Sequence, residues 1–311
     1  MTRLTNLLEI KHPIIQGGMA WISDAKLAAA VSEAGGAGII SLGGRTVEWA
    51  KKEINSAKGL TDKPFGVNIQ LMADNKEELV DLVCAEKVAF VTLGAGNPIP
   101  FFERLLRAGV KIIPVVPNVK LAKRVEANGA DAIIVEGMEA GGHIGTVTTM
   151  ALMTQVIPEI TIPVIAAGGF ADGRGLAAAL VMGASGIQMG TRFLVAEECA
   201  VHENCKLKLL AATDTDSVIT GAFSGHAVRG LKNKFTDYYI HLERRCAPSD
   251  ELTKLSVGTN RLAAIDGDVD NGMIQAGQSL LGLKKIEPVK VIVDNIIAEA
   301  REIFRSQANL L

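Results

Sequence analysis

The chain has 311 residues, of which 48% are hydrophobic and 21% charged, and its formal net charge is −2. This composition predicts a globular protein with a large core and excludes the strongly basic field that nucleic acid or an anionic membrane surface would attract. No apolar run reaches the roughly 18 residues of a membrane span, and the first residues lack the apolar region of a signal peptide, so we expect a cytoplasmic protein. The cysteines lack metal-site spacing and predict free thiols: Cys84, Cys199, Cys205 and Cys246.

Short apolar runs rich in β-branched residues recur at intervals of 21 to 31 residues, beginning near Ile14, Gly38, Phe65, Ala89, Lys111, Ala132, Pro163 and Gly186. Segments with apolar residues every three or four positions lie between them and predict helices: Ala25–Ala34, Val47–Ile54, Lys76–Val83, Phe101–Ala108, Val119–Ala127, Thr148–Val156 and Gly175–Met182. Because the runs are continuously apolar, they indicate a parallel sheet buried on both faces. Eight such units predict an α/β fold, a (β/α)8 TIM barrel. An open doubly wound sheet is the alternative, but no G-x-G-x-x-G loop follows the first run.

The remaining sequence divides into two parts. Residues 199–272 are more polar, lack the alternation of strands and helices, and predict a small inserted domain that contacts substrate or acts as a lid. Residues 288–311 carry apolar side chains at helical spacing and predict a helix that returns to the barrel wall. We therefore expect a barrel domain from residues 1–198 and 273–311, with the inserted domain on its C-terminal side.

The longest interval contains the segment Glu136–Gly145, which directly follows the apolar run Ala132–Val135. Active sites of (β/α)8 barrels lie at the C-terminal ends of the strands, and histidine exchanges protons near neutral pH. Gly141 and Gly142 would let the backbone approach a ligand closely. We predict His143 as the catalytic residue of a site here. The alternative is a tight turn whose histidine is satisfied by local hydrogen bonds.

Glycine also ends the seventh and eighth runs, as Gly168-Gly169 and Gly190-Thr191-Arg192. In many (β/α)8 barrels these two loops and a short following helix bind phosphate, because backbone N–H groups and a helix N-terminus favour an anion. Thr191 adds a hydroxyl donor and Arg192 a cation. We predict a phosphate site here, with two ordinary glycine turns as the alternative.

The first run ends in Gly17-Gly18-Met19, where a flat ring could lie against the backbone and a thioether. Amide side chains at three strand ends would suit the polar edge of a heteroaromatic ring: Gln16, Asn68 and Gln188. No cofactor-linking lysine stands out, which argues against pyridoxal phosphate. A flavin with a phosphate, FMN, fits best. Ordinary hydrogen bonds at the strand ends are the alternative for each amide.

These motifs resemble the flavin barrel family that contains nitronate monooxygenase and the flavin-dependent enoyl-acyl-carrier-protein reductase. The resemblance covers nearly the whole chain and rests on Pro13–Met19, Lys63–Asn68, Gly94–Pro98, Ile113–Pro117, Glu136–Gly145, Pro163–Gly169, Gly190–Phe193, Gly225–Arg229 and Gly267–Asp270. Both branches share the Glu-Ala-Gly-Gly-His segment. Glu136, Gly225–Arg229 and Gly267–Asp270 followed by Gly277-Gln278 are more similar to the reductase branch.

The resemblance implies an enoyl-acyl-carrier-protein reductase of fatty acid synthesis that holds FMN and uses NADH or NADPH. Its substrate would be a trans-2-enoyl thioester on acyl carrier protein or coenzyme A. His143 would lie in the reaction cavity. The residues expected to bind the cofactor are Gly17, Gly18, Met19, Asn68, Glu136, Gly141, Gly142, Gly168, Gly169, Gln188, Gly190, Thr191, Gly277 and Gln278. The resemblance also implies a homodimer and activation by a monovalent cation, whose site the sequence does not place.

Two other functions stay open at this point. A nitronate monooxygenase would use the same histidine on a small nitroalkane, and a flavin-binding protein would hold FMN without turnover. The reductase would need a basic rim for its acidic carrier protein, and the candidates are Lys120, Lys123, Arg124, Arg229, Lys232 and Lys234. Runs of charge are more often simply solvated faces.

Overall fold

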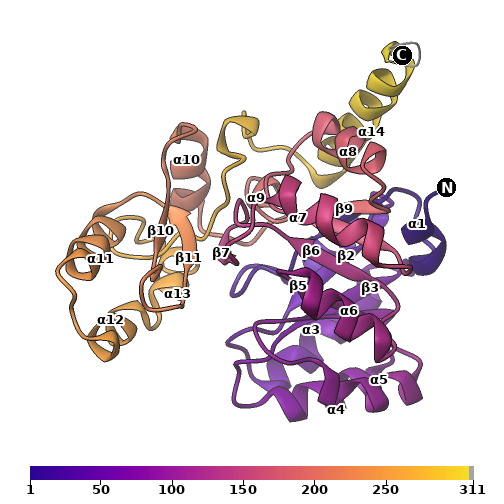
Figure 1. Cartoon of the computed structure of the whole chain (residues 1–311), viewed down its shortest axis with the longest axis horizontal. Helices are drawn as coiled ribbons and strands as arrows, with labels where there is room; N and C mark the ends of the chain where they lie inside the picture. The colour runs from indigo at the N-terminus through magenta and orange to yellow at the C-terminus, as the bar shows by residue number, and fades with distance from the viewer. Residues whose placement is uncertain (308–311) are drawn as a thin grey trace.

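Eight parallel strands form the wall of a (β/α)8 barrel, which confirms the predicted α/β fold (Figure 1). The computed structural model describes residues 1–307. Neighbouring strands follow the order β1-β9-β8-β6-β5-β4-β3-β2, and a parallel bridge between Ile15 and Ala37 joins β1 to β2, so the barrel is nearly closed. The strands are β1 (Ile14–Gln16), β2 (Gly38–Ser41), β3 (Phe65–Gln70), β4 (Phe90–Gly94), β5 (Lys111–Val116), β6 (Ile133–Glu136), β8 (Val164–Ala167) and β9 (Gly186–Met189).

Helices cover the outside of the barrel: α2 (Ala25–Glu33), α3 (Val47–Leu60), α4 (Lys76–Glu86), η1 (Ile99–Phe101), α5 (Phe102–Ala108), α6 (Val119–Ala127), α7 (Thr149–Val156), η2 (Ile157–Glu159) and α8 (Gly173–Val181). Capping side chains stabilise the starts of α2, α3 and α8. Asp24, Thr46 and Asp172 each accept a hydrogen bond from the backbone N–H of the residue three positions later. Helices α3 and α4 continue past their predicted ends at Ile54 and Val83. The last turn of α3 is mostly exposed and that of α4 is only partly buried, so the apolar periodicity that marks a helix fades there.

Apolar side chains fill the barrel from its amino-terminal end. Ile39, Phe90 and Ile134 from the strands form one buried cluster with Leu4 of the short helix α1 (Arg3–Leu8). Leu4 lies so close to Gly186 that a Cβ at this glycine would fall 2.6 Å from its side chain. Because the amino-terminal end is filled, the open end is the carboxyl-terminal one, where barrels of this kind place their active sites.

The last helix, α14 (Val289–Ser306), returns to the barrel wall as predicted and packs against α8 and α2. Gly173 at the start of α8 lies against the backbone of α14, where a Cβ would fall 2.5 Å from the nitrogen of Ala300. The Gly173 N–H also donates to the Glu299 carboxylate (2.7 Å). Residues 308–311 of the predicted segment lie outside the described residues.

A lobe beside the barrel, drawn mainly in orange in Figure 1, follows the short helix α9 (Thr191–Leu194). We use "lobe" for the elements α10 (Glu203–Ala211), β10 (Ser217–Thr220), β11 (Val228–Leu231), α11 (Lys234–Arg244), α12 (Ser249–Ser256) and α13 (Thr259–Ala264). Its antiparallel sheet has the order β10-β11-β7, and the third strand, β7 (Gly142–His143), comes from the predicted active-site loop. A small apolar core links the lobe's helices to the following chain: Phe235, Tyr239, Leu252 and Met273. That residues 199–272 form an inserted domain stays a prediction.

Within residues 1–307, no helix is both long and apolar enough to cross a membrane. In the same residues, no group of three or more His, Cys, Asp or Glu side chains is arranged to hold a metal ion. All four cysteines are free, as the sequence predicted.

Candidate active site

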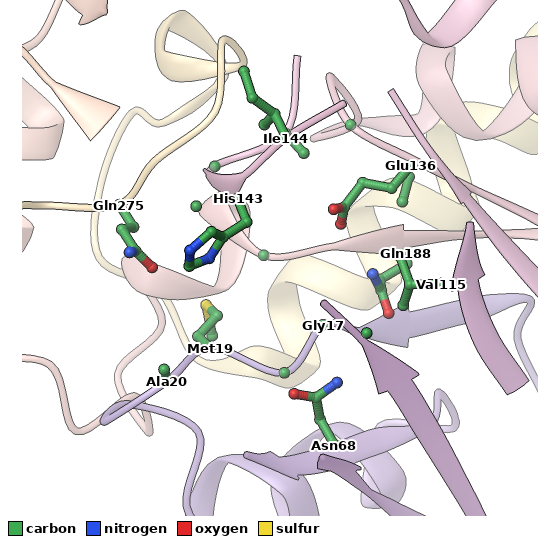
Figure 2. Close-up of a pocket in the computed structure, with 18 of the residues that line it drawn as sticks. Gly17, Met19, Ala20, Asn68, Val115, Glu136, His143, Ile144, Gln188 and Gln275 are labelled. Carbon is green, nitrogen blue, oxygen red and sulfur yellow. The ribbon is translucent and has the colours of Figure 1, made fainter. Parts of the chain in front are cut away.

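A cavity of about 510 Å³ lies at the carboxyl-terminal ends of the barrel strands (Figure 2). Thirteen of the predicted site residues line it: Gly17, Gly18, Met19, Asn68, Glu136, Gly141, Gly142, His143, Gly168, Gly169, Gln188, Gly190 and Thr191. They come from five strand ends and from β7, so residues far apart in sequence meet around one space. The lining within the described residues contains no lysine or arginine.

One end of the cavity holds a cluster of unused backbone donors. The N–H groups of Gly168, Gly169, Gly190 and Thr191 donate to no protein acceptor within residues 1–307. Gly168 and Gly169 have φ values of +95° and +84°, which glycine adopts without strain. Thr191 is buried, Gly168 and Gly190 are half-buried and Gly169 is exposed. Free backbone N–H groups that gather at the ends of neighbouring strands form an anion-binding concavity, so these four indicate an anionic ligand. These residues therefore fit the phosphate of FMN.

The wall after β1 leaves no space for a side chain at Gly18 and little space for one at Gly17. A Cβ at Gly18 would lie 2.4 Å from the Cβ of Asn68, and one at Gly17 would lie 3.3 Å from the side chain of Gln188. The Asn68 amide donates to Thr92 Oγ1 (2.9 Å), while its carbonyl oxygen accepts from no group among the described residues. A flat ring could lie on this glycine surface with its polar edge on the amides, so the residues also fit the isoalloxazine of a flavin.

Gln16, the third predicted amide, is instead part of the scaffold. Its Nε2 donates to the Gly17 carbonyl and to Ser23 Oγ (2.9 Å), and its Oε1 accepts from the Ile39 N–H (3.0 Å). The side chain is fully buried. The ordinary strand-end hydrogen bonds considered as its alternative are what the structure shows.

Glu136 ends β6 and points into the cavity (Figure 2). Its carboxyl pairs with no donor among the described residues, and burial raises its pKa to about 7. Because a charged carboxylate is costly in such surroundings, the group is largely neutral below neutral pH. A neutral carboxyl can donate a hydrogen bond, which the amide oxygens around it cannot do.

His143 is held by the lobe rather than by the barrel. It lies opposite Val228 in the pairing of β7 with β11, and the next residue, Ile144, donates its N–H to the Ala227 carbonyl (3.1 Å). The imidazole faces the cavity near Met19 (Figure 2). Burial, and secondarily the charge of His226, lower the pKa of His143 below its ordinary value. The ring is therefore neutral at pH 7 and keeps one N–H donor and one lone pair.

The loop between β6 and β7 is fixed at several points. The Glu139 carboxylate accepts from the backbone N–H (2.8 Å) and hydroxyl (2.9 Å) of Thr149 at the start of α7. Arg229, a candidate for a basic rim, is buried and donates to the Met138 carbonyl (2.8 Å) and to Ser217 Oγ (3.0 Å). It therefore anchors the loop to the lobe instead of facing a partner.

Gly277 and Gln278 lie behind the cavity wall rather than on its surface. The Gly277 N–H donates to Thr191 Oγ1 (2.9 Å), and the Gln278 N–H donates to the Glu139 carbonyl (2.9 Å). A Cβ at Gly277 would fall 2.5 Å from that same carbonyl oxygen. These residues tie the chain after the lobe to the barrel, and their contact with a flavin stays a prediction.

Arg192 does not offer its charge to the cavity. It forms a buried ion pair with Glu287 (2.6 Å), whose other oxygen is 3.2 Å from Lys285. Removing either partner from a buried pair leaves an uncompensated charge, so this arginine is committed to the scaffold. Any phosphate at the free N–H groups would be held by backbone dipoles and hydrogen bonds without a cationic side chain.

Several cavity residues were not anticipated from the sequence: Trp21, Glu139, Asn260, Gln275 and Ser279. Asn260 donates to the Ala20 carbonyl (3.5 Å), so the start of α13 touches the loop after β1. Gln275 and Ser279 flank the Gly277-Gln278 motif in an otherwise apolar stretch, and this polar spacing was a usable signal. No local signal marks Asn260, because its place depends on the docking of the lobe.

The family model of nitronate monooxygenase matches residues 1–81 and 70–299. The chain belongs to the nitronate monooxygenase family. FabK from Thermotoga maritima superposes over 100% of this chain and 99% of its own, with a TM-score of 0.97 and 46% identity.

Two curated relatives extend the comparison. A (3aS,4S,5R,7aS)-5-hydroxy-7a-methyl-1-oxo-octahydro-1H-indene-4-carboxyl-CoA dehydrogenase from Rhodococcus jostii (strain RHA1) is 40% identical over 240 residues, 77% of this chain and 68% of the relative. A probable nitronate monooxygenase from Staphylococcus aureus (strain JH9) is 33% identical over a 350-residue alignment, which covers 97% of this chain and 98% of the relative. Members of this family, FabK included, are flavin (FMN) enzymes, and this chain is an oxidoreductase of the family.

Proposed function

We propose that this protein is an FMN-dependent enoyl-acyl-carrier-protein reductase that reduces trans-2-enoyl thioesters with NADH or NADPH. The observation that carries the proposal is a cavity that joins four free backbone N–H groups to a glycine surface and a neutral histidine. The similarity to FabK, an enoyl-acyl-carrier-protein reductase II, over the full length supports this branch of the family. The Rhodococcus relative, by its name a carboxyl-CoA dehydrogenase, supports a thioester substrate.

Different residues around the cavity would contact different parts of the cofactor. Gly168, Gly169, Gly190 and Thr191 would hold the phosphate, and Gly17, Gly18 and Met19 would lie against the ring, with Asn68 and Gln188 at its polar edge. Gly141, Gly142, Gly277 and Gln278 would shape the wall beside it. FMN, when bound, supplies the hydride transfer between the nicotinamide and the enoyl group.

His143 is the residue we assign to proton transfer. Its neutral ring can hold by hydrogen bonds a water that supplies the proton to C2 of the enoyl group as charge grows on the thioester oxygen. The imidazolium form of the ring can instead donate that proton itself and is left as neutral imidazole. A positioned general acid contributes on the order of 10²–10⁴-fold. Glu136, whose pKa burial raises to about 7, adds a second donor in its neutral form, which predominates below that pH. The apolar wall residues Val115 and Ile144 would exclude water from the reacting atoms.

Nitronate monooxygenase is the second candidate function. The family model and the Staphylococcus relative carry that name, and the lowered pKa of His143 suits a base or anion partner for a small nitroalkane. Oxygen would then reoxidise the flavin. Both candidates use the same cavity, so the fold does not separate them.

Anaerobic stopped-flow absorbance at the flavin band separates them. The purified protein is reduced with NADH and mixed with a trans-2-enoyl thioester. We expect rapid return of oxidised flavin with formation of the saturated thioester. A flavin that stays reduced until oxygen is admitted would overturn the reductase assignment and would make an alkyl nitronate the next substrate.

Further properties remain part of the proposal. We expect a homodimer, a cytoplasmic location and activation by a monovalent cation. The partner that delivers the substrate would be acyl carrier protein, or coenzyme A in its place. Size-exclusion chromatography with light scattering tests the dimer, and turnover with K⁺ against a bulky organic cation tests the activation.

A further inference from the structure

Both tryptophans of the chain stack on one arginine at the mouth of the cavity. The guanidinium carbon of Arg45 lies 4.6 Å from the ring centroid of Trp21 and 4.2 Å from that of Trp49. Trp21 follows β1, while Arg45 precedes α3 and Trp49 lies in its first turn. Two cation–π contacts orient the guanidinium and hold it between two barrel loops.

This arginine has no carboxylate partner among residues 1–307. Its Nη2 donates to the Trp21 carbonyl (2.9 Å), and its Nε is buried without an acceptor. The carboxylates whose charges reach it, Asp24 and Glu53, accept instead from backbone N–H groups at the start of α2. A half-buried cation with unused donors is energetically costly. An anion that pairs with this arginine therefore gains more binding free energy than an anion that pairs with a solvated lysine.

A second cleft connects this arginine to the cavity. The cleft measures about 590 Å³ and is lined by Gly44–Glu48, Gln70 and Met72–Asn75. Gly44 and Gln70 also border the main cavity, so the two spaces adjoin. Arg45 therefore lies where the non-reacting end of a long ligand would leave the cavity.

The backbone of Trp21 is strained, and this conformation places its indole beside both Gly44 and Arg45. Its φ of +69° is rare for a bulky side chain, and its indole lies on Gly44, where a Cβ would fall 2.6 Å from the ring. The ring thus forms part of the cavity wall while it also contacts the guanidinium. Strained residues that surrounding structure holds in place cluster at ligand sites.

The charges around the cleft leave the arginine available to an anion. Glu48 and Asp74 border the cleft, but both are exposed, so water and salt screen their repulsion. Arg261 of α13 brings a second positive charge from the lobe, but this arginine is paired with Asp266 (3.0 Å). Burial first, and the charge of Arg261 in addition, lower the pKa of Arg45. An arginine stays charged at neutral pH despite such effects.

We propose that Arg45, held by Trp21 and Trp49, binds a phosphate group of a ligand whose reactive end lies in the cavity. This rests on the proposed function, which supplies two ligands of that chemistry: the nicotinamide coenzyme, with its diphosphate, and the phosphopantetheine arm of the thioester. A planar guanidinium offers parallel N–H donors that match phosphate oxygens in a bidentate geometry. The stacked indoles fix the plane of those donors.

Tryptophan fluorescence of the holoenzyme tests this directly, because the only two tryptophans lie on Arg45. NAD⁺, coenzyme A and the N-acetylcysteamine thioester of crotonate, which has no phosphate, are titrated separately. Because Trp21 also borders the cavity, the N-acetylcysteamine thioester can change the emission, but its half-saturating concentration should be the same in wild type and in R45M. With NAD⁺ or coenzyme A we expect a saturable change in emission that depends on Arg45. In R45M the half-saturating concentration should rise about tenfold.

Arg104 provides a matched control. It also lies over an aromatic ring, 5.5 Å from the centroid of Phe101, but pairs with Glu77 and Asp81 and borders neither cleft nor cavity. R104M should leave each titration unchanged. R45K keeps the charge without the planar fork and should recover part of the affinity, which also covers the case in which R45M folds poorly.

Steady-state kinetics identify the source of the phosphate. R45M should raise KM about tenfold for NADH or for the enoyl-CoA, with little change in kcat, and leave KM for the N-acetylcysteamine thioester unchanged. Which of the two KM values rises names the ligand that Arg45 holds. If neither KM nor either titration changes, or if the phosphate-free thioester is weakened equally, Arg45 only supports the fold of Trp21 and the inference is wrong. If wild-type protein fails to reduce enoyl thioesters, the proposed function fails, while the fluorescence titrations still decide the phosphate site.

Discussion

The carboxyl of Glu136 makes the stability of the ligand-free protein depend on pH in a specific direction. Burial raises its pKa to about 7 in the folded chain, from the ordinary 4.5. Below about pH 4.5 both the folded and the unfolded chain hold the proton. Between about pH 4.5 and 7 only the unfolded chain releases it, so the free energy of unfolding falls as pH rises. Above about pH 7 the carboxyl is ionised in both the folded and the unfolded chain, so the free energy of unfolding falls no further.

The magnitude follows from the two pKa values. At 1.36 kcal/mol for each pH unit, the difference between about 7 and 4.5 corresponds to roughly 3 kcal/mol. The substitution Glu136→Gln keeps the shape of the side chain and removes its ionisation. We therefore expect the variant and the wild type to be about equally stable near pH 4.5, with the variant roughly 3 kcal/mol more stable at pH 8.

Urea unfolding of the ligand-free protein between pH 5 and 8.5, followed by circular dichroism and fluorescence, measures this difference. Glu139→Gln is a matched control from the same loop, because its carboxylate accepts from the backbone N–H and hydroxyl of Thr149. That variant should be less stable than wild type throughout the range, since a charge-assisted helix cap is weakened. The reasoning is refuted if Glu136→Gln is no more stable than wild type at pH 8. It is also refuted if the gain in the free energy of unfolding is the same at pH 5 and pH 8.

Four further outcomes are expected. His143→Ala should slow enoyl reduction by about 10²–10⁴-fold with flavin content unchanged, and wild-type turnover would remove the proton-transfer role. The pKa of His143, followed by NMR, should lie below 6.5 and rise in His226→Ala, because the charge of His226 contributes to lowering it. Gly18→Ala places a Cβ 2.4 Å from Asn68, so the purified variant should lack the flavin absorbance band. Thr191→Val leaves a buried backbone N–H without its acceptor and should cost about 1–3 kcal/mol in urea unfolding.

The barrel and thirteen of the residues that line the cavity could be predicted because their signals are local. A strand buried on both faces must be apolar at every position, and a strand end that approaches a ligand needs glycine. Both features are visible in a window of a few residues, as at Val164–Gly169 and Gly186–Gly190. The free N–H groups at Gly168 and Gly169 then follow from positive φ values that glycine permits.

The partners of the charged side chains could not be predicted in this way. Arg192 was considered for the phosphate, yet it pairs with Glu287, 95 residues further along the chain. Arg229 was considered for an exposed rim, yet it is buried and holds the Met138 carbonyl. A charged side chain pairs with whichever acceptor the fold brings near it. Spacing along the sequence carries no information about which acceptor that is.

By itself, the sequence determined the eight-stranded barrel, the open carboxyl-terminal end and the histidine placed there, because burial patterns and glycine turns are written residue by residue. Only the tertiary structure decided how His143 is held. The segment Gly142–His143 is too short to show any periodicity. It forms a strand because β11 of the lobe offers it an unpaired edge. The same docking brings Asn260 and Gln275 to the cavity, since contacts between distant segments form only when the whole chain is folded.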